Sequence, residues 1–141
     1  MHVELAQSDA DIERVADVML ELRTAFERAD LVAQMQAQRG EGYQIAWVEA
    51  DGEVLCVAGF VVGTKLAWGR HIYVDDLVTA VKHRSTGAGR TMIEWLKAHA
   101  RRLGCRELHL DSGVQRFAAH RFYLRERFDI DSHHFSTSEL G

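Results

Sequence analysis

The sequence predicts a single mixed α/β (α+β) domain over residues 1–141, in which helices cover a central, mostly antiparallel sheet. Three observations predict this class. The chain is 47% hydrophobic and 27% charged, the balance of a globular domain with a buried core. Apolar residues recur at strand and helix spacings, in the order strand, two helices, three antiparallel strands, helix, strand, helix and final strand. A glycine-bearing loop joins the third of those antiparallel strands to a long helix.

Charge and cysteine usage argue against several classes of protein. The formal net charge is -4, so nothing indicates a nucleic-acid or membrane-surface protein that depends on bulk positive charge. Cys56 and Cys105 lack metal-type spacing and stand in apolar or strand-like surroundings, which predicts reduced thiols with a packing role. The first residues show no signal pattern, and no run approaches the ~20 apolar residues of a membrane span. We therefore expect a cytoplasmic protein.

The first forty residues predict a strand and two helices. Residues 2–7 alternate weakly and indicate a short strand. Ser8 and Asp11 form a capping-box pattern, which predicts the start of a helix. Apolar residues then recur at helical spacing at Ile12, Val15, Met19, Leu22 and Phe26. A shorter helix is expected after Ala29-Asp30, through Leu31, Val32 and Met35 to Arg39-Gly40.

The middle of the chain predicts three consecutive strands. Residues 43–49 and 53–62 flank Asp51-Gly52, a strong hairpin turn. The second of these strands is apolar at both its odd and its even positions, which point to opposite faces of a sheet, so it should be covered on both faces. Residues 63–69 form a looser turn before the third strand, 71–79.

The stretch from Asp75 to Arg90 predicts the end of a strand, a loop and the start of a helix. Gly87 and Gly89 allow backbone conformations closed to other residues, so successive N–H groups can point at one anion. The helix start adds its first-turn N–H groups and the positive end of its dipole, and Arg84 and Arg90 add charge. The anion would be a phosphate. The alternative is a glycine turn with only a structural role.

The remaining residues predict a helix, a strand, a helix and a final strand or pair of strands. The first of these helices begins near Ala88 and ends at Gly104. A short strand carries Leu108 and Leu110, a helix follows from about residue 116 to 126, and residues 128–139 form the last, polar strand or strands.

The loop resembles a known coenzyme-binding signature. The run Arg84-Ser85-Thr86-Gly87-Ala88-Gly89 matches the Arg/Gln-x-x-Gly-x-Gly/Ala pattern of the GCN5-related N-acetyltransferase (GNAT) superfamily, which binds the pyrophosphate of acetyl-CoA there. Val81 replaces the proline that often precedes this loop in the family. The resemblance implies a GNAT-like mixed sheet of six or seven strands flanked by four helices. The coenzyme-binding residues that it implies are Arg84, Ser85, Thr86, Gly87, Ala88, Gly89 and Arg90, with the strand residues Leu77, Val78 and Thr79.

The stretch Ala118–Phe128 resembles the superfamily's late helix, in which a small residue precedes a tyrosine by four positions. Ala119 and Tyr123 match this pattern and share a helix face, although Arg116 and Arg127 stand where many members carry asparagine and glycine. The resemblance implies that Tyr123 donates a proton to the coenzyme sulfur. A phenol suits this role because its ordinary pKa of about 10 lies near that of a thiol. The alternative is an aromatic side chain packed against the sheet.

An amine nucleophile must lose a proton, and a carboxylate can accept it directly or through water. Asp75 and Asp76 precede the loop, and at most one should face the site unless a bulge intervenes. Resembling aminoglycoside-type members carry a carboxylate at this spacing, which favours Asp76, with a solvated or ion-paired aspartate as the alternative. In the family this strand splays from the next one, so backbone N–H groups at Leu77 to Thr79 would hold the oxyanion and pair with the pantetheine amides.

The sequence does not identify the acceptor. Family topology implies that the first two helices border its pocket. Each pocket candidate has the alternative explanation of a core, sheet or surface residue. The candidates are Phe26, Glu27, Met35, Trp47, Trp68, Arg70 and Tyr73. His120 could touch the coenzyme or be hydrogen-bonded structure, and His133-His134 lacks a third ligand, so no metal is predicted.

The function expected from the sequence is transfer of an acetyl group from acetyl-CoA to a primary amine, of a small molecule or a peptide, by direct attack. One alternative is an acyltransferase that uses a different acyl-CoA or a hydroxyl acceptor. Another is a non-catalytic coenzyme-A-binding sensor or partner-binding module. No nucleic acid or membrane partner is expected, and an exposed final strand would allow a homodimer.

Overall fold

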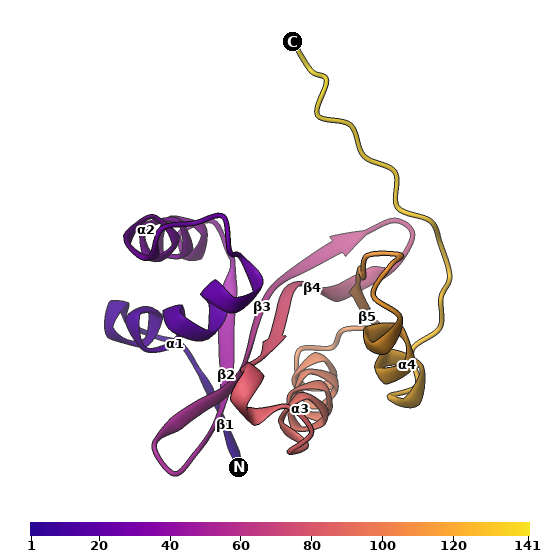
Figure 1. Ribbon diagram of the computed structural model, residues 1–141. Helices are drawn as coiled ribbons and strands as arrows, with labels where there is room; N and C mark the ends of the chain where they lie inside the picture. The colour runs from indigo at the N-terminus through magenta and orange to yellow at the C-terminus, as the bar shows by residue number, and fades with distance from the viewer. The chain divides into compact units, whose positions relative to one another are not determined.

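The computed structural model describes every residue from 1 to 141 (Figure 1). Its chain forms two compact units, Met1–Leu110 and Asp111–Gly141. The first unit contains the sheet and three helices, and the second contains the last helix and the C-terminal segment. None of the helices combines the length and apolar character that crossing a membrane would need.

The first unit is built on one five-stranded sheet in the order β1-β2-β3-β4-β5. The strands are β1 (His2–Leu5), β2 (Gln44–Ala50), β3 (Glu53–Lys65), β4 (Gly69–Thr79) and β5 (Glu107–Leu110). Neighbouring strands pair antiparallel except β4 and β5, which are parallel. The mixed, mostly antiparallel class is confirmed. The expected count of six or seven strands is wrong.

Helices cover both faces of this sheet (Figure 1). Helices α1 (Asp9–Leu22) and α2 (Arg28–Arg39) share a buried cluster with Val57 of β3. Phe60 lies an odd number of positions further along β3 and therefore on the other face, where it packs edge-on against Trp95 of α3 (Ala88–Arg102), with ring centroids 6.2 Å apart. The run from Leu55 to Phe60 is buried, so the prediction that this strand is covered on both sides is confirmed.

Short-range signals placed most element ends correctly. The Ser8 hydroxyl accepts a hydrogen bond from the Asp11 amide at 3.2 Å and caps α1. Asp51 and Gly52 have φ values of 53° and 77°, as a tight two-residue hairpin requires. The helical pattern to Phe26 overshoots, because the chain leaves α1 after Leu22 and Phe26 lies in the connection to α2.

The second unit contains α4 (Phe117–Arg125) and its cap. The Phe128 amide donates to the Tyr123 carbonyl at 3.0 Å and the Arg127 amide to the Leu124 carbonyl at 3.1 Å, which is the Schellman pattern. The Tyr123 and Phe128 rings meet edge-on with centroids 5.8 Å apart, the apolar contact that accompanies this cap. Arg127 occupies the left-handed position of the motif at φ 70°.

The predicted last strand or strands over residues 128–139 are absent, and no helix or strand follows α4. This stretch is mainly polar and almost entirely exposed. Its only apolar residues are Phe128, Ile130 and Phe135, so it offers little apolar area to stabilise pairing with a sheet edge.

Replacing Arg127 by glycine should stabilise the end of α4. A left-handed φ is unfavourable for a residue with a Cβ, so the substitution should raise the free energy of unfolding of this segment by about 1 kcal/mol. Hydrogen exchange of the α4 amides should slow accordingly. Arg125→Gly, within the helix, is the matched control and should destabilise α4 by about 1 kcal/mol. Faster exchange in Arg127→Gly would contradict the strain argument.

Candidate active site

The loop before α3 presents a run of unpaired backbone amides. After the short 3-10 helix η1 (Val81–His83), Ser85 and Gly87 take left-handed φ values of 64° and 90°. No backbone amide from residue 85 to residue 90 has an acceptor within the chain. The Thr86 hydroxyl donates to the His83 carbonyl at 2.6 Å and steadies the turn. This arrangement fits an anion that takes several N–H donors together with the start of a long helix.

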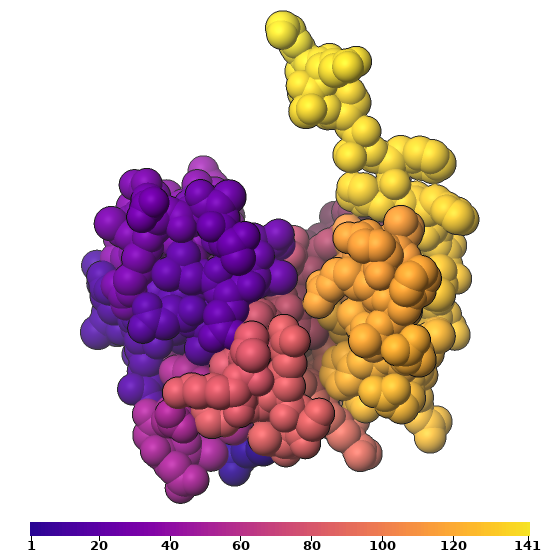
Figure 2. All heavy atoms as spheres, in the orientation of Figure 1, coloured from indigo at the N-terminus to yellow at the C-terminus, as the bar shows by residue number.

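The formal charge at this loop comes from two arginines. Arg84 and Arg90 are exposed, and neither forms an ion pair within the chain. Lys82 and His83 instead contact the Glu53 carboxylate, at 2.9 and 3.2 Å. Figure 2 shows the segment leading into α3, in salmon, at the surface beside the indigo residues of α1. A diphosphate could therefore approach both free guanidinium groups from solvent.

Strand β4 has an open edge just before this loop. Its parallel pairing with β5 ends at Val74 and Leu110, so the only strand that pairs with residues 75–79 is β3, on their other side. The Ala80 amide donates to the Leu55 carbonyl of β3 at 2.9 Å. Along an antiparallel strand, residues alternate between those that form hydrogen bonds with the neighbouring strand and those whose N–H and C=O groups point away from it. Leu77 and Thr79 therefore direct their N–H and C=O groups toward the open edge, whereas Val78 directs them to β3. The expected splay is present, and it narrows the candidate amides to these two.

A bulge decides how the two aspartates face. Gly59 of β3 is opposite Asp76 while Phe60 is opposite Val74, so Asp75 is an extra residue in β4. Asp76 consequently lies on the face that α1 and α2 cover, and its side chain is 13% exposed. The side chain of Asp75 is on the surface.

Asp76 is the centre of a hydrogen-bonded network that sequence reasoning missed. The Tyr43 hydroxyl donates to Asp76 Oδ2 at 2.6 Å, and Arg23 Nε donates to Asp76 Oδ1 at 2.8 Å. Tyr43 is only 5% exposed, and burial first, then the charge of Asp76, raises its pKa above the ordinary value, so the phenol remains a donor. The one available signal was Gly59, an isolated glycine inside an apolar strand, because such a glycine often marks close approach of another group. The Tyr43 ring occupies that space.

In the second unit, Ala119 and Tyr123 lie on α4 as expected, and both are partly buried. Arg116 is the residue that precedes the helix rather than a member of its face. His120 Nε2 is hydrogen-bonded to the Gly113 carbonyl at 2.8 Å, which agrees with a structural role for this histidine.

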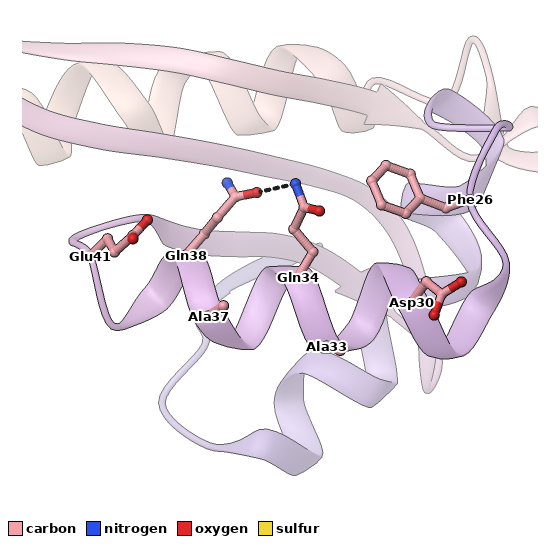
Figure 3. Close-up of a pocket in the computed structure, with 7 residues that line it drawn as sticks. All are labelled: Phe26, Asp30, Ala33, Gln34, Ala37, Gln38 and Glu41. Atoms are coloured by element: carbon pink, nitrogen blue, oxygen red, sulfur yellow. Dashed lines mark hydrogen bonds between the residues drawn. The ribbon is translucent and has the colours of Figure 1, made fainter.

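The residues proposed for an acceptor pocket separate into two groups. Met35 is 3% exposed in the core, and the buried indole of Trp47 donates to Glu49 at 3.1 Å. Phe26 lines a shallow depression of about 570 Å³ along α2 (Figure 3). The other lining residues are Asp30, Ala33, Gln34, Ala37, Gln38 and Glu41.

A second group of candidates clusters near the β3–β4 turn. The Trp68 ring stacks on His109 with centroids 3.5 Å apart, and Lys65 Nζ lies 3.9 Å from the Trp68 centroid. Tyr73 stacks on Trp68 at 5.8 Å. Arg70 instead donates to the Leu103 carbonyl at 2.8 Å, which accounts for it as a sheet-to-helix contact.

Neither cysteine is in a disulfide. Cys56 is buried in β3, and desolvation raises the pKa of its thiol to about 11, so it stays protonated and unreactive near neutral pH. Cys105 is partly exposed. The packing role predicted for the first of these thiols is confirmed.

Comparison with known proteins agrees with this geometry. The chain matches the Acetyltransferase (GNAT) family over residues 12–128. It is 28% identical over 137 residues to the uncharacterized N-acetyltransferase YhdJ of Bacillus subtilis (strain 168), with 96% of each chain covered. The ribosomal-protein-alanine N-acetyltransferase of Brucella melitensis biovar Abortus 2308 has a TM-score of 0.84 at 16% identity, covering 97% of this chain and 99% of that one. The aminoglycoside N-acetyltransferase AAC(6')-Iy in complex with CoA has a TM-score of 0.83 at 12% identity, with 99% and 96% covered.

An amide-rich loop at a helix start, next to an open strand edge, has the donors and acceptors to receive an extended ligand that ends in a diphosphate. The chain belongs to the acetyltransferase (GNAT) family, and it is an acetyl-CoA-dependent N-acetyltransferase.

Proposed function

We propose that the protein transfers the acetyl group to a primary amine by direct attack, with both substrates bound at once. The observation that carries this proposal is the continuity of two unpaired backbone surfaces. The outward edge of β4 at Leu77 and Thr79 leads within a few residues into the free amides of residues 85–90. A ligand with amide groups at one end and a diphosphate at the other matches both.

The loop and the strand edge bind different parts of acetyl-CoA. Amides 85–90, with Arg84 and Arg90, bind the diphosphate, and the open edge pairs with the pantetheine amides. When bound, acetyl-CoA supplies the acetyl group as a reactive thioester. A main-chain N–H of Leu77 or Thr79 donates to the carbonyl oxygen and stabilises the negative charge that develops there.

Two side chains carry out the proton transfers of the reaction. Asp76 accepts the proton of the amine, directly or through water. Its contacts with Arg23 and Tyr43 leave lone-pair capacity on Oδ2, because a carboxylate offers about four acceptor positions. Asp75 or water alone is the alternative acceptor. Tyr123 donates a proton to the departing sulfur, as the matched late helix implies.

We further propose that the acceptor amine approaches along the depression beside Phe26. Asp30 and Glu41 line it, and neither carboxylate forms an ion pair within the chain. A protonated amine would be attracted there before it loses its proton. The surface is open and places no narrow limit on acceptor size.

The coenzyme part of the proposal is tested with a matched pair of glycines at the two ends of α3. Gly87 and Gly104 both have positive φ, 90° and 71°, and an added Cβ would meet nothing within 4 Å at either. Ala at either position therefore introduces similar backbone strain, but only Gly87 belongs to the loop. Gly87→Ala should weaken CoA binding roughly tenfold by calorimetry, as about 1.4 kcal/mol corresponds to a factor of ten. Gly104→Ala should bind CoA like the wild type, and equal weakening would contradict the loop assignment.

The transfer itself is tested by the mass of acetylated product across amino acids, polyamines, aminoglycosides and peptide N-termini. Acetylation of one amine class, with formation of free CoA, supports the proposal and identifies the acceptor. Tight CoA binding without turnover of any class would favour a non-catalytic coenzyme-binding protein.

A further inference from the structure

The end of α1 contacts the chain near both ends of the open edge, in β4 and at the start of η1. The Glu21 carboxylate accepts the Val81 amide at 2.8 Å, just after that edge. Arg23 donates from Nε to Asp76 Oδ1 at 2.8 Å and from its terminal nitrogen to the Asp75 carbonyl at 3.1 Å, just before it. Residues from one helix turn therefore bind both ends of the segment that exposes Leu77 and Thr79.

A third side chain holds Asp76 from its other oxygen. The buried Tyr43 hydroxyl donates to Oδ2 at 2.6 Å, while the ring covers Gly59 in β3. Because β5 does not pair beyond Val74, the segment is held by the β3 ladder, by these three side chains and by the core packing of Val78 and Ala80.

Val81 gives a further reason to connect these contacts with the coenzyme. It stands where a proline often precedes the loop in the resembling family, and a proline would fix the backbone without an N–H. Here the N–H is present and its acceptor comes from α1, so a tertiary contact holds the turn.

We propose that Glu21, Arg23 and Tyr43 are positioning residues that hold residues 76–81 so that the Leu77 and Thr79 main-chain groups can pair with the coenzyme. The proposal rests on the proposed function, since it assigns that edge to the pantetheine arm. It is a claim about alignment: the three side chains act through the strand and need not touch either substrate.

If the three side chains had only a packing role, replacing them would lower the stability of the protein without changing how it binds CoA. Arg28 provides a control for this possibility. Arg28 also joins parts of the helical layer, with contacts of 2.7 Å to Glu13 and 2.8 Å to Asp17. Its side chain is 43% exposed, close to the 46% of Arg23, but its partners do not reach β4. Arg28→Gln therefore removes the ion pairs of an arginine that is as exposed as Arg23, without disturbing the edge.

The test combines CoA affinity by calorimetry with amide hydrogen exchange in Glu21→Ala, Arg23→Gln and Tyr43→Phe. We expect each to weaken CoA binding roughly five- to twentyfold, corresponding to about 1–2 kcal/mol. At saturating CoA the gain of protection should fall at residues 76–80 and persist at residues 85–90. Glu21→Gln retains an acceptor for Val81 and should recover part of the affinity, while Arg28→Gln should match the wild type in both measurements.

Each outcome is decisive for the positioning role. A wild-type gain of protection at residues 76–80 in the variants overturns it, whatever the affinity. Tyr43→Phe keeps the ring over Gly59. Should the other two variants fail to fold, Tyr43→Phe alone tests the positioning role. Wild-type protein that does not bind CoA overturns the proposed function as well, whereas normal binding by wild type and all variants overturns only the positioning role.

Discussion

Tyr123→Phe is expected to lower kcat by about 10²- to 10⁴-fold, the usual contribution of a positioned general acid. Without the phenol the sulfur must leave as an unprotonated thiolate. The substitution removes one oxygen and keeps the ring, so the edge-on contact with Phe128 and the cap of α4 should persist. Steady-state kinetics with the best acceptor of the amine panel measure the effect.

The loss should be confined to the chemical step. CoA affinity should remain at the wild-type value, because the loop before α3 and the open edge of β4 are unchanged. A variant that keeps a rate within about threefold of wild type would remove Tyr123 from the mechanism, as it would fall far short of the ~10²-fold contribution.

The features predicted from sequence are those whose causes are short-range. The Ser8 cap, the Asp51-Gly52 turn and the Gly87 loop each depend on residues a few positions apart. Their backbone requirements can be recognised without knowing what packs around them. The position and the backbone turn of the loop that we propose to bind the coenzyme were therefore predictable.

The contacts of Asp76, the proton acceptor that we propose, join residues far apart in the sequence and could not be predicted from spacing. Arg23 and Asp76 are 53 positions apart, and Tyr43 and Asp76 are 33 apart. The bulge at Asp75 determines which aspartate faces the helices, and alternation alone left that choice open. The end of α1 before Phe26 has a similar origin, since Arg23 leaves the helix and turns toward β4.

Departures from the family pattern gain a physical meaning in the structure. Arg127 stands at a glycine position, and its φ of 70° shows why glycine is favoured there. Val81 stands at a proline position, and its amide makes a contact that proline could not. Both substitutions retain the local geometry, the first with backbone strain and the second through a distant carboxylate.

Gly59→Ala should be the most destabilising single methyl addition in the sheet. A Cβ at residue 59 would lie 1.6 Å from the Tyr43 hydroxyl oxygen and 2.2 Å from its ring carbon, so the whole phenol must move. Overpacking and loss of a buried hydrogen bond to Asp76 together predict a loss of roughly 2–6 kcal/mol in the free energy of unfolding. Urea denaturation measures this directly.

Two comparisons separate the steric cause from a general intolerance of β3. Gly63→Ala, four residues along the same strand, would place its Cβ 3.5 Å from His71 and should change the unfolding free energy by less than about 1 kcal/mol. In a Tyr43→Leu background the overlapping phenol is gone, so adding Gly59→Ala should then have a much smaller effect, and the two substitutions should be strongly non-additive. Equal losses from Gly59→Ala in both backgrounds would show that the close approach of Tyr43 is not what requires glycine. The position of Tyr43 beside Asp76 would then no longer explain why a glycine stands in the middle of an apolar strand.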